Sequence, residues 1–566
     1  MNNETQSQSV SRRALLRLSG MSVAFLTLGG TGSLLSSCAA PQTTTAPIQL
    51  VAQPVPAFAP DLEIDLTATE TTVQILPGAL TKVLSYQGKV LQGDPGAVVA
   101  VPNSYLGPII RTRTGQKVRI RFQNNLNEAS NIHWHGVITP PTMDGHPRDL
   151  AAANGEYVYE FEVRNRAGAY WFHPHAHERT AEQAYHGLAG LFIVNDEEEE
   201  KLALPTGAQE IPLVLQDRRF DADNQFVYIT ADMGGAMDGM TERMMGFLGD
   251  RILVNGQPDV TLPVATRAYR LRLLNGSNSR IFKLGWSNGM PMMVIATDGG
   301  LLEKPLARPY ITLAPGERIE LWADFRMQTV GAEIKLQSLT YSGVEAGMME
   351  HTAELPNGAP FDVLTVKVDK EEAETLTLPT QLARMERYQV ADAGNQNAPR
   401  QFVLSMDNNM NWTINGRAFV MDEVAADEQI AFGALEVWEF VNEMPASMTS
   451  SANNAHSGHG AQGTTGTMQM QGTMMGGMQD FMAHPMHLHG VQFQVAERQI
   501  AEEQRTGWET VKDGYVDEGW KDTVLVMPGE RVKLLMRFAD YRGMYVYHCH
   551  NLEHEDMGMM RNYLVD

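Results

Sequence analysis

The sequence predicts an all-β protein built from β-sandwich domains, and three observations support this fold class. Short segments with alternating apolar and polar residues recur along the chain. Glycine, proline and asparagine separate these segments, as is typical of turns between strands. No long run of residues has the apolar spacing of an amphipathic helix. The clearest strand candidates are Lys117–Phe122, Glu156–Val163, Ala268–Leu273, Arg318–Trp322, Leu435–Phe440 and Arg531–Met536.

Three of these candidate strands resemble one another, which predicts repeats of one structural unit. Residues 115–124, 268–275 and 434–442 each alternate apolar with polar residues and end in asparagine. We therefore expect three consecutive sandwiches. Their expected bounds are 61–200, 201–370 and 401–566, with a polar linker at 371–400.

The N-terminus resembles an export signal over residues 1–38. Arg12 and Arg13 form a twin-arginine pattern, and an apolar run follows to Leu35. That run is short and contains glycine and serine throughout, so a permanent transmembrane helix is not expected. Leu35-Ser-Ser-Cys38 resembles a lipoprotein cleavage box, and the alternative is an ordinary cleavage site just after it. We expect a periplasmic or cell-envelope protein, with a disordered tether at 39–60 and lipid anchoring at Cys38 as one alternative.

The C-terminal segment that begins at His548 carries the clearest chemistry. It follows a predicted strand, Met544–Tyr547, and side chains alternate between the two faces of a strand. Cys549 should therefore point to one face, and His548 and His550 to the other. Metals bound on the two faces would be connected by adjacent peptide units, which is a short path for an electron.

The residue types around Cys549 indicate copper. Cys549, His554 and Met559 supply a thiolate, an imidazole and a thioether, and one more imidazole would complete the ligand set of an electron-transfer copper. The chain has only one other cysteine, Cys38. A four-cysteine zinc or iron–sulfur site is therefore excluded, and so is a disulfide framework.

Three further segments contain histidines two residues apart. They are His133-Trp-His135, His173-Pro-His175 and His487-Leu-His489, and the last is preceded by His484. Residues two apart on a strand lie ~6.6 Å apart on one face, so each pair could reach one metal cluster. An isolated pair more often consists of ordinary surface or core histidines that bind no metal. Together with the pair that flanks Cys549, however, the four pairs supply eight imidazoles, which would suit a three-copper group with two, three and three ligands.

These four segments resemble the four copper-binding signatures of the multicopper oxidases, a family that includes laccases, bilirubin oxidases and bacterial cuprous oxidases. The resemblance covers about residues 60–566 and keeps the family's order of motifs. It implies three consecutive cupredoxin-like Greek-key β-sandwich domains. It also implies four copper ions: one type 1, one type 2 and a type 3 pair.

The resemblance assigns each ligand. His484, Cys549 and His554 match the type 1 ligands, and Met559 matches the axial ligand by its ten-residue offset from Cys549. The remaining matches are His133 and His487 for type 2, and His135, His173, His175, His489, His548 and His550 for type 3. His177 continues the alternation after His175, but the family pattern stops at two. The metal motifs lie in the first and third repeats, so the middle repeat is expected to act as a spacer and brace.

Two acids are candidate proton donors. Reduction of dioxygen to water takes four electrons and four protons, so acids are needed close to the cluster. Asp144 and Glu555 match acids that the family keeps near the three-copper group. The alternative for each is a loop carboxylate that holds a turn or the imidazole of a ligand.

Methionine content bears on the substrate. The chain has 33 methionines, and many lie in a loop at 449–482 that leads directly to His484. Residues 449–477 contain no valine, isoleucine or leucine, so these methionines have little core to fill. Thioethers in a solvated loop, with His456 and His459 beside them, suit soft Cu(I). The alternative is a simple disordered linker.

Three residues resemble the substrate-metal ligands of bacterial cuprous oxidases. They are Met406, Asp480 and Met482. Where those oxidases have a further acid, this chain has Asn411, so the resemblance is incomplete at this site.

The leading expectation is an oxidase that takes electrons one at a time from Cu(I) at the type 1 site. The electrons would pass through Cys549 to His548 and His550, and dioxygen would be reduced to water. The alternatives are a laccase that oxidises phenols and a copper-sequestering protein. The net charge of −23 argues against binding to nucleic acid. The expected partners are therefore O₂ and a Cu(I) or phenolic reductant, with the chain a monomer.

Overall fold

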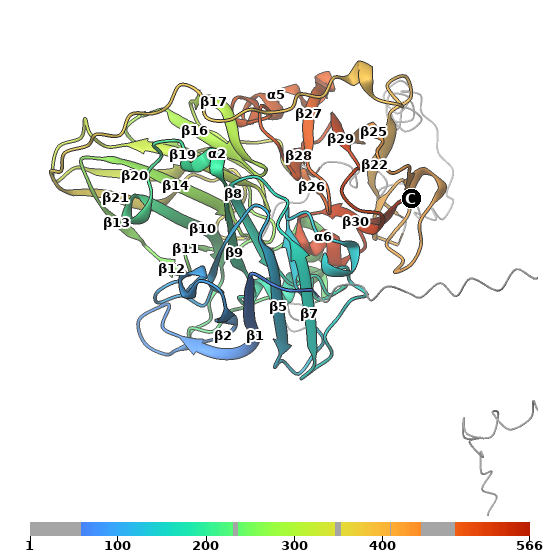
Figure 1. The fold of residues 1–566 in the computed structure, drawn as a ribbon, viewed down its shortest axis with the longest axis horizontal. Helices are drawn as coiled ribbons and strands as arrows, with labels where there is room; N and C mark the ends of the chain where they lie inside the picture. The colour runs from blue at the N-terminus through green and yellow to red at the C-terminus, as the bar shows by residue number, and fades with distance from the viewer. Residues whose placement is uncertain (1–57, 230–235, 346–352, 408, 443–481) are drawn as a thin grey trace, which may run out of the picture. The chain divides into compact units, whose positions relative to one another are not determined.

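The protein consists of three β-sandwiches in sequence order (Figure 1), as a computed structural model shows for residues 58–229, 236–345, 353–407, 409–442 and 482–566. The predicted all-β class is confirmed, and each of the six predicted strands lies within an observed strand or overlaps most of one. The predicted export signal and Cys38 lie outside the described residues, as do His456, His459, Asp480 and nearly all of the methionine-rich loop. No helix within the described ranges is long and apolar enough to cross a membrane.

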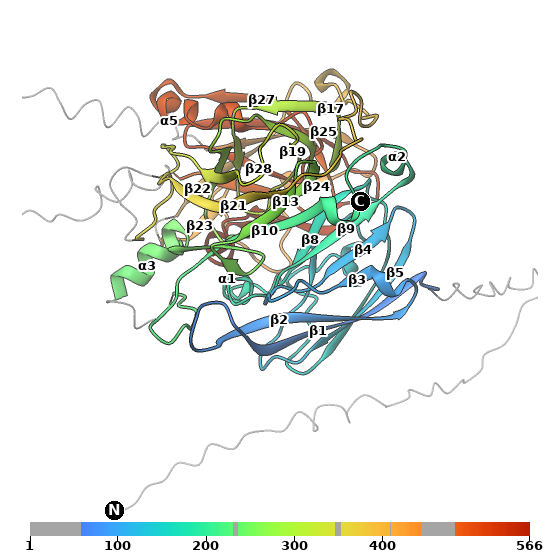
Figure 2. The same ribbon diagram turned by 90° about the vertical axis from the view of Figure 1, so that its left-hand side faces the viewer.

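The first sandwich has a four-stranded and a five-stranded sheet. The first sheet runs β2 (Thr81–Gln92), β1 (Leu62–Val73), β5 (Lys117–Asn124) and β7 (Glu156–Glu162). The second runs β3 (Val98–Val99), β4 (Ile109–Arg113), β9 (Gly190–Asn195), β8 (Gly168–His173) and β6 (His133–His135). Inward-facing residues such as Ile64, Ile120 and Phe192 form the core between the sheets. Figure 2 shows β1 and β2 side by side along the outside.

The middle sandwich has a seven-stranded and a five-stranded sheet. The first runs β12 (Gln257–Pro258), β11 (Arg251–Val254), β10 (Glu210–Arg218), β14 (Ala268–Asn275), β19 (Arg318–Asp324), β16 (Met292–Thr297) and β17 (Gly300–Arg308). The second runs β13 (Thr261–Ala265), β21 (Phe361–Lys370), β20 (Glu333–Ser338), β15 (Phe282–Trp286) and β18 (Ile311–Leu313). Leu271, Leu321 and Val366 are fully buried between them.

The third sandwich has two five-stranded sheets. The first runs β23 (Trp412–Ile414), β22 (Arg400–Met406), β25 (Leu435–Val441), β29 (Glu530–Arg537) and β27 (Phe493–Ile500). The second runs β24 (Gln429–Ile430), β31 (Met560–Val565), β30 (Gly543–Cys549), β26 (His484–Leu488) and β28 (Thr523–Val526). The second sheet therefore carries both C-terminal histidine motifs on adjacent strands.

The three strands that resemble one another in sequence hold the same position in the three sandwiches. β5, β14 and β25 each pair in parallel with an earlier strand and antiparallel with a later one. Their terminal asparagines are buried and donate to backbone carbonyls of the segments that follow each strand. The side chain of Asn442, for example, donates to the Met482 carbonyl at 2.7 Å. The repeated asparagine thus fixes the loop after each repeated strand.

The helices in the described ranges are short and lie where sandwiches meet. They are α1 (Thr180–Tyr185), α2 (Glu197–Glu200), α3 (Ala236–Met245), α5 (Arg505–Glu509) and α6 (Leu552–Asp556). α2 is the acidic run at the end of the first sandwich, and the Asp196 side chain caps it. Both α1 and α3 contact α6. The Asp556 carboxylate accepts hydrogen bonds from the backbone N–H groups of Thr180 and Ala181, so it joins α1 of the first sandwich to α6 of the third.

Candidate metal centre

The antiparallel pair of β26 and β30 divides the candidate ligands into two groups. His487 lies opposite His548, and Met486 lies opposite Cys549. Side chains alternate along β30, so His548 lies on the face opposite Cys549. His550, the residue after Cys549, lies on the same side as His548. The structure therefore brings the predicted ligands together in the two groups that the alternation of the sequence indicates.

The first group contains the thiol of Cys549. Its Sγ lies 3.5 Å from His484 Nδ1 and 3.6 Å from His554 Nδ1, and these two nitrogens lie 3.2 Å apart. All three side chains are buried, and burial lowers the pKa of His484 to about 3 and raises the pKa of the Cys549 thiol. His554 Nε2 donates to the Met244 carbonyl at 2.9 Å, which leaves the lone pair on Nδ1. A soft cation between these three atoms would satisfy all of them.

Met559 lies beside this first group. Its backbone carbonyl accepts from Cys549 N–H, and its own N–H donates to the His554 carbonyl. Met559 is fully buried in the same apolar cluster as Cys549, whereas Met560 belongs to a different cluster. The backbone thus holds Met559 next to both of the neighbouring candidate ligands.

The second group contains eight histidines from the first and third sandwiches. His133 Nε2 lies 3.3 Å from His487 Nε2. His548 Nε2 lies 3.2 Å from His175 Nε2 and 3.1 Å from His489 Nε2. The remaining three are His135, His173 and His550, whose ring centroids lie 4.9 to 5.7 Å apart. The donor atoms of His175, His489 and His548 lie within 4.8 Å of one another, and His133 and His135 share clusters with both His173 and His487.

The protonation of these rings shows that a cation fits between them. The Nδ1 atoms of His133 and His487 donate to the backbone carbonyls of Asp144 and Asp522 at 2.7 and 2.8 Å. A carbonyl can only accept, so the proton is on Nδ1 and the lone pair is on Nε2. The two Nε2 lone pairs therefore face each other at 3.3 Å, which is repulsive unless a cation lies between them.

Several ring nitrogens of the second group are buried without a hydrogen-bond partner among the described residues. They include His135 Nδ1, His173 Nε2 and both nitrogens of His550. Such atoms are costly unless a ligand satisfies them. Burial also lowers the pKa of His173 to about 3 and of His548 to about 4, which keeps the imidazoles neutral as metal binding requires. The site therefore fits the copper group that the resemblance implies.

The two candidate acids contact this second group directly. Asp144 Oδ2 accepts from His489 Nδ1 at 2.6 Å, while the Asp144 carbonyl accepts from His133. Glu555 lies 3.3 Å from His548 Nδ1 and 3.6 Å from His175 Nδ1. Both carboxyls are fully buried, and burial raises the pKa of each well above its ordinary value. Each acid can therefore hold a proton beside the imidazoles.

Other residues of the site carry no motif and were missed in the sequence. The centroid of the Trp412 ring lies 4.4 Å from the centroid of the His554 ring and 4.9 Å from that of the His484 ring. Trp171 lies 4.3 Å from the His173 ring. Asp522 and Thr523 bond the His135 imidazole at 3.0 and 3.1 Å. A sequence signal exists only for Trp171, which lies two residues before His173 on the same strand and so on the same face.

The candidate substrate residues are only partly described. Met406 and Met482 are buried in the apolar cluster that contains Cys549 and Trp412, and Met406 lies opposite Trp412 across the β22–β23 pair. Asp480 lies outside the described residues. The Asn411 side chain donates to Asp407 at 3.1 Å, within the same turn. His177 is partly exposed and packs on Phe419, apart from both ligand groups.

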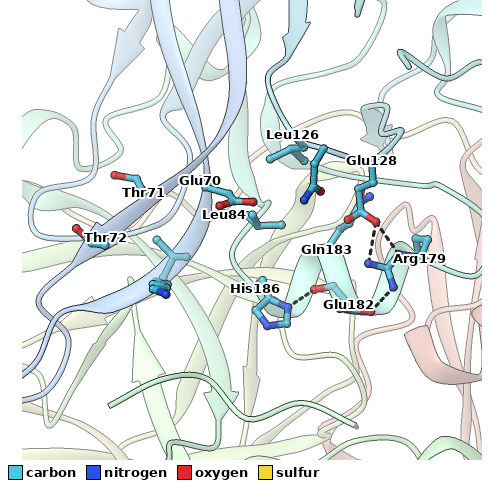
Figure 3. Close-up of a pocket in the computed structure, with 13 residues that line it drawn as sticks. Glu70, Thr71, Thr72, Leu84, Leu126, Glu128, Arg179, Glu182, Gln183 and His186 are labelled. Carbon is cyan, nitrogen blue, oxygen red and sulfur yellow. Dashed lines mark hydrogen bonds and ion pairs between the residues drawn. The ribbon is translucent and has the colours of Figure 1, made fainter. Parts of the chain in front are cut away.

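An open cavity of about 580 Å³ lies elsewhere, on the first sandwich. Figure 3 shows Thr71 and Thr72 on one side of it and Glu128, Arg179 and Glu182 on the other. Arg179 pairs with both glutamates, and none of the candidate ligands lines the cavity. This cavity is therefore not the entrance to either ligand group.

Comparisons with known proteins agree with this geometry. Residues 83–199 and 392–566 match two family models, each described as multicopper oxidase. A multicopper oxidase of Staphylococcus aureus is 28% identical over 498 residues, which are 88% of this chain and 86% of that protein. A laccase of Bacillus stratosphericus is 28% identical over 80% of this chain and 88% of its own length.

A solved structure extends the match to the whole fold. The crystal structure of a variant of the McoA multicopper oxidase from the hyperthermophile Aquifex aeolicus is 33% identical in sequence, with a TM-score of 0.71. The match covers 90% of this chain and 97% of that chain. With the paired histidines of the first and third sandwiches converging on one centre, this chain belongs to the multicopper oxidase family, whose members use copper.

Proposed function

We propose that the chain oxidises a one-electron donor at a type 1 copper site and reduces dioxygen to water at a three-copper site. His484, Cys549, His554 and Met559 would hold the first copper. The other three would be held by His133 and His487, by His175, His489 and His548, and by His135, His173 and His550. When bound, the coppers supply the one-electron oxidation of substrate and the four-electron reduction of O₂. The facing imidazole lone pairs are the observation that carries this proposal.

The polypeptide itself joins the two sites. Single peptide bonds connect Cys549 to His548 and to His550, so the shortest covalent path between the ligand groups is a few bonds of backbone. The whole path is buried, which keeps water away from it. Asp144 and Glu555 would supply protons next to the imidazoles, since each is buried and in contact with ligands from this cluster.

The surroundings of His554 favour Cu(I) over phenols as the electron donor. In a phenol oxidase, the substrate must approach an imidazole edge of the type 1 site. Here the Met244 carbonyl at the end of α3 already occupies the Nε2 edge of His554. Buried thioethers of Met406 and Met482 lie in the surrounding apolar cluster, and thioethers select Cu(I). The methionine-rich loop that precedes Met482 would collect the ion. A laccase function is the second candidate, because a laccase is among the relatives.

Oxygen uptake with two donors tests the proposal. The full chain and a variant lacking residues 450–478 would each be supplied with Cu(I) and with a bulky phenol, with and without added Cu(II). We expect the deletion to lower Cu(I) oxidation and to raise phenol oxidation. Unchanged rates with both donors would contradict the role of the loop. A wild-type protein that binds copper but consumes no O₂ with either donor would instead indicate copper sequestration.

The place of action is also a proposal. Arg12, Arg13 and the apolar run that follows support twin-arginine export to the periplasm or cell envelope. A Cu(I) oxidase in the periplasm or cell envelope would protect the cell against copper.

A further inference from the structure

We propose that Arg318 of the middle sandwich is a positioning residue for the imidazole of His135 and acts through Asp522. The inference rests on the proposed function, because it takes His135 as a ligand of the three-copper site. It assigns the middle sandwich a direct part in shaping that site, although this sandwich carries none of the histidine motifs.

The Arg318 guanidinium is buried, and each of its nitrogens is bonded. Nε donates to the Ala169 carbonyl at 3.0 Å, in the strand of the first sandwich that also carries His173. Within the middle sandwich, Nη1 and Nη2 donate to the Gly316 and Asp298 carbonyls at 3.0 and 3.1 Å. Both also donate to the Asp522 carboxylate of the third sandwich, at 2.7 and 2.5 Å. One side chain thus connects all three sandwiches, with a planar fork that lysine cannot reproduce.

Asp522 transmits this geometry to two candidate ligands. Its Oδ1 lies 3.0 Å from His135 Nε2, and the Thr523 hydroxyl lies 3.1 Å from the same nitrogen. Its backbone carbonyl accepts from His487 Nδ1 at 2.8 Å. The position of residue 522 therefore sets the orientation of one imidazole from the first sandwich and one from the third.

The contact also selects the tautomer of His135. The Asp522 carboxylate, which is paired with Arg318, accepts a hydrogen bond from His135 Nε2–H, so the proton is on Nε2 and the lone pair is on Nδ1. His135 Nδ1 is buried without a partner among the described residues, as a donor atom for copper should be. His133 and His487 have the opposite arrangement, because backbone carbonyls hold the proton on their Nδ1 atoms. The tautomer of His135 therefore depends on the Arg318–Asp522 pair, whereas the tautomers of His133 and His487 depend on backbone carbonyls.

The loop that precedes Arg318 also packs against the imidazoles. Gly316 has φ +83°, and a β-carbon there would lie 3.0 Å from the His550 ring and 3.1 Å from His135 Cε1. The backbone of the middle sandwich at Gly316 thus lies close to the rings of His135 and His550, with no room for a side chain between them. A shift of this loop would move Arg318 and these two rings together.

The test compares Arg318→Lys with Arg272→Lys in the full-length protein. Arg272 is an equally buried arginine of the same sandwich, and its guanidinium pairs with Glu199, Glu210 and Glu320 instead. Copper content per chain, the blue absorption band, and the spin-resonance and near-ultraviolet signals of the three-copper site would be recorded. Retention of copper against a chelator would be measured well below each variant's unfolding temperature.

We expect Arg318→Lys to keep the blue band but to hold copper at the three-copper site about 10- to 100-fold more weakly. Arg272→Lys should lower the unfolding temperature without this selective loss. Asp522→Asn keeps the shape but removes the charge, and should reproduce the loss if Arg318→Lys folds poorly. Normal copper signals in both Arg318→Lys and Asp522→Asn would overturn the inference, as would equal losses in Arg318→Lys and the control. A wild-type chain without a three-copper signal would instead refute the proposed function.

Discussion

Asp144 accepts hydrogen bonds from two imidazoles. Its carboxylate accepts from His489, and its backbone carbonyl accepts from His133. We expect Asp144→Asn to lower turnover about 100-fold, because the amide can still accept from His489 but cannot deliver a proton. The blue band should remain, since Asp144 contacts His489 and His133 and none of the proposed type 1 ligands. Steady-state oxygen uptake and the visible spectrum check this.

The control for this variant is Asp149→Asn, which changes an acid of the same loop that pairs with Arg148. It should leave turnover near the wild-type value. Wild-type oxygen uptake in Asp144→Asn would leave Asp144 with only a structural part in the loop.

At the residue scale, the sequence predicts which side chains share one face of a strand. It does not predict which side chains from distant segments meet at the site. The histidine pairs could be predicted to share a face because the alternation of a strand places residues two apart on one side. Trp412 and Asp522 lack such a local signal, since their neighbours at the site come from distant segments or from a separate sheet. Their positions follow only from the folded chain.

At the element scale, α3 reaches from the middle sandwich to cover His554. The helix ends at Met245, and its Met244 carbonyl accepts from His554 Nε2. Gly246 follows with φ +90°, and a β-carbon there would lie 2.4 Å from the Asn551 side chain and 2.5 Å from Ser279 Cβ. The close approach of α3 to α6 therefore requires glycine at this position.

Gly246→Ala should push the end of α3 away from α6. We expect the bond from His554 to Met244 to weaken, and kcat/KM for a bulky phenol to rise. The strained backbone should cost about 1–3 kcal/mol of stability. Gly289→Ala is the matched control, because Gly289 also has a positive φ, +75°, but has open space around it. Phenol oxidation that changes equally in both variants would show that α3 does not restrict access to His554.

At this scale the sequence indicates strands better than helices. The strands follow from alternation, and the repeated asparagines identified the equivalent strands β5, β14 and β25. α3 was not predicted from the sequence. Its position depends on contacts with α6, more than 300 residues later in the chain, and helices this short carry little periodic signal of their own.

At the scale of the whole molecule, the first and third sandwiches are joined by buried polar contacts as well as by the shared ligand group. Tyr545 donates to the Thr139 carbonyl at 2.7 Å. His146 Nε2 lies 2.9 Å from Asn562 Oδ1, so it donates to that amide oxygen. These contacts hold together the two sandwiches that supply the candidate ligands. They should also determine how the copper-free protein responds to acid.

His146 makes this response specific. Burial, with a smaller effect of Arg148, lowers its pKa from 6.5 to about 4, although Asn562 and Asp422 act in the opposite direction. The unfolded chain therefore binds a proton between pH 6.5 and about 4 that the folded chain does not bind. Stability is full above pH 6.5 and falls as the pH decreases, and this one group contributes roughly 3 kcal/mol of that fall.

His146→Gln tests this contribution, because glutamine can still donate to Asn562 but does not titrate. The unfolding free energy of copper-free wild-type protein and of the variant would be measured by urea denaturation from pH 7 to pH 4. We expect the variant to lose less stability across this range, by an amount close to the contribution of one histidine. Parallel pH profiles would mean that His146 is charged in the folded state. The acid sensitivity of the junction between the sandwiches would then have to come from other buried groups.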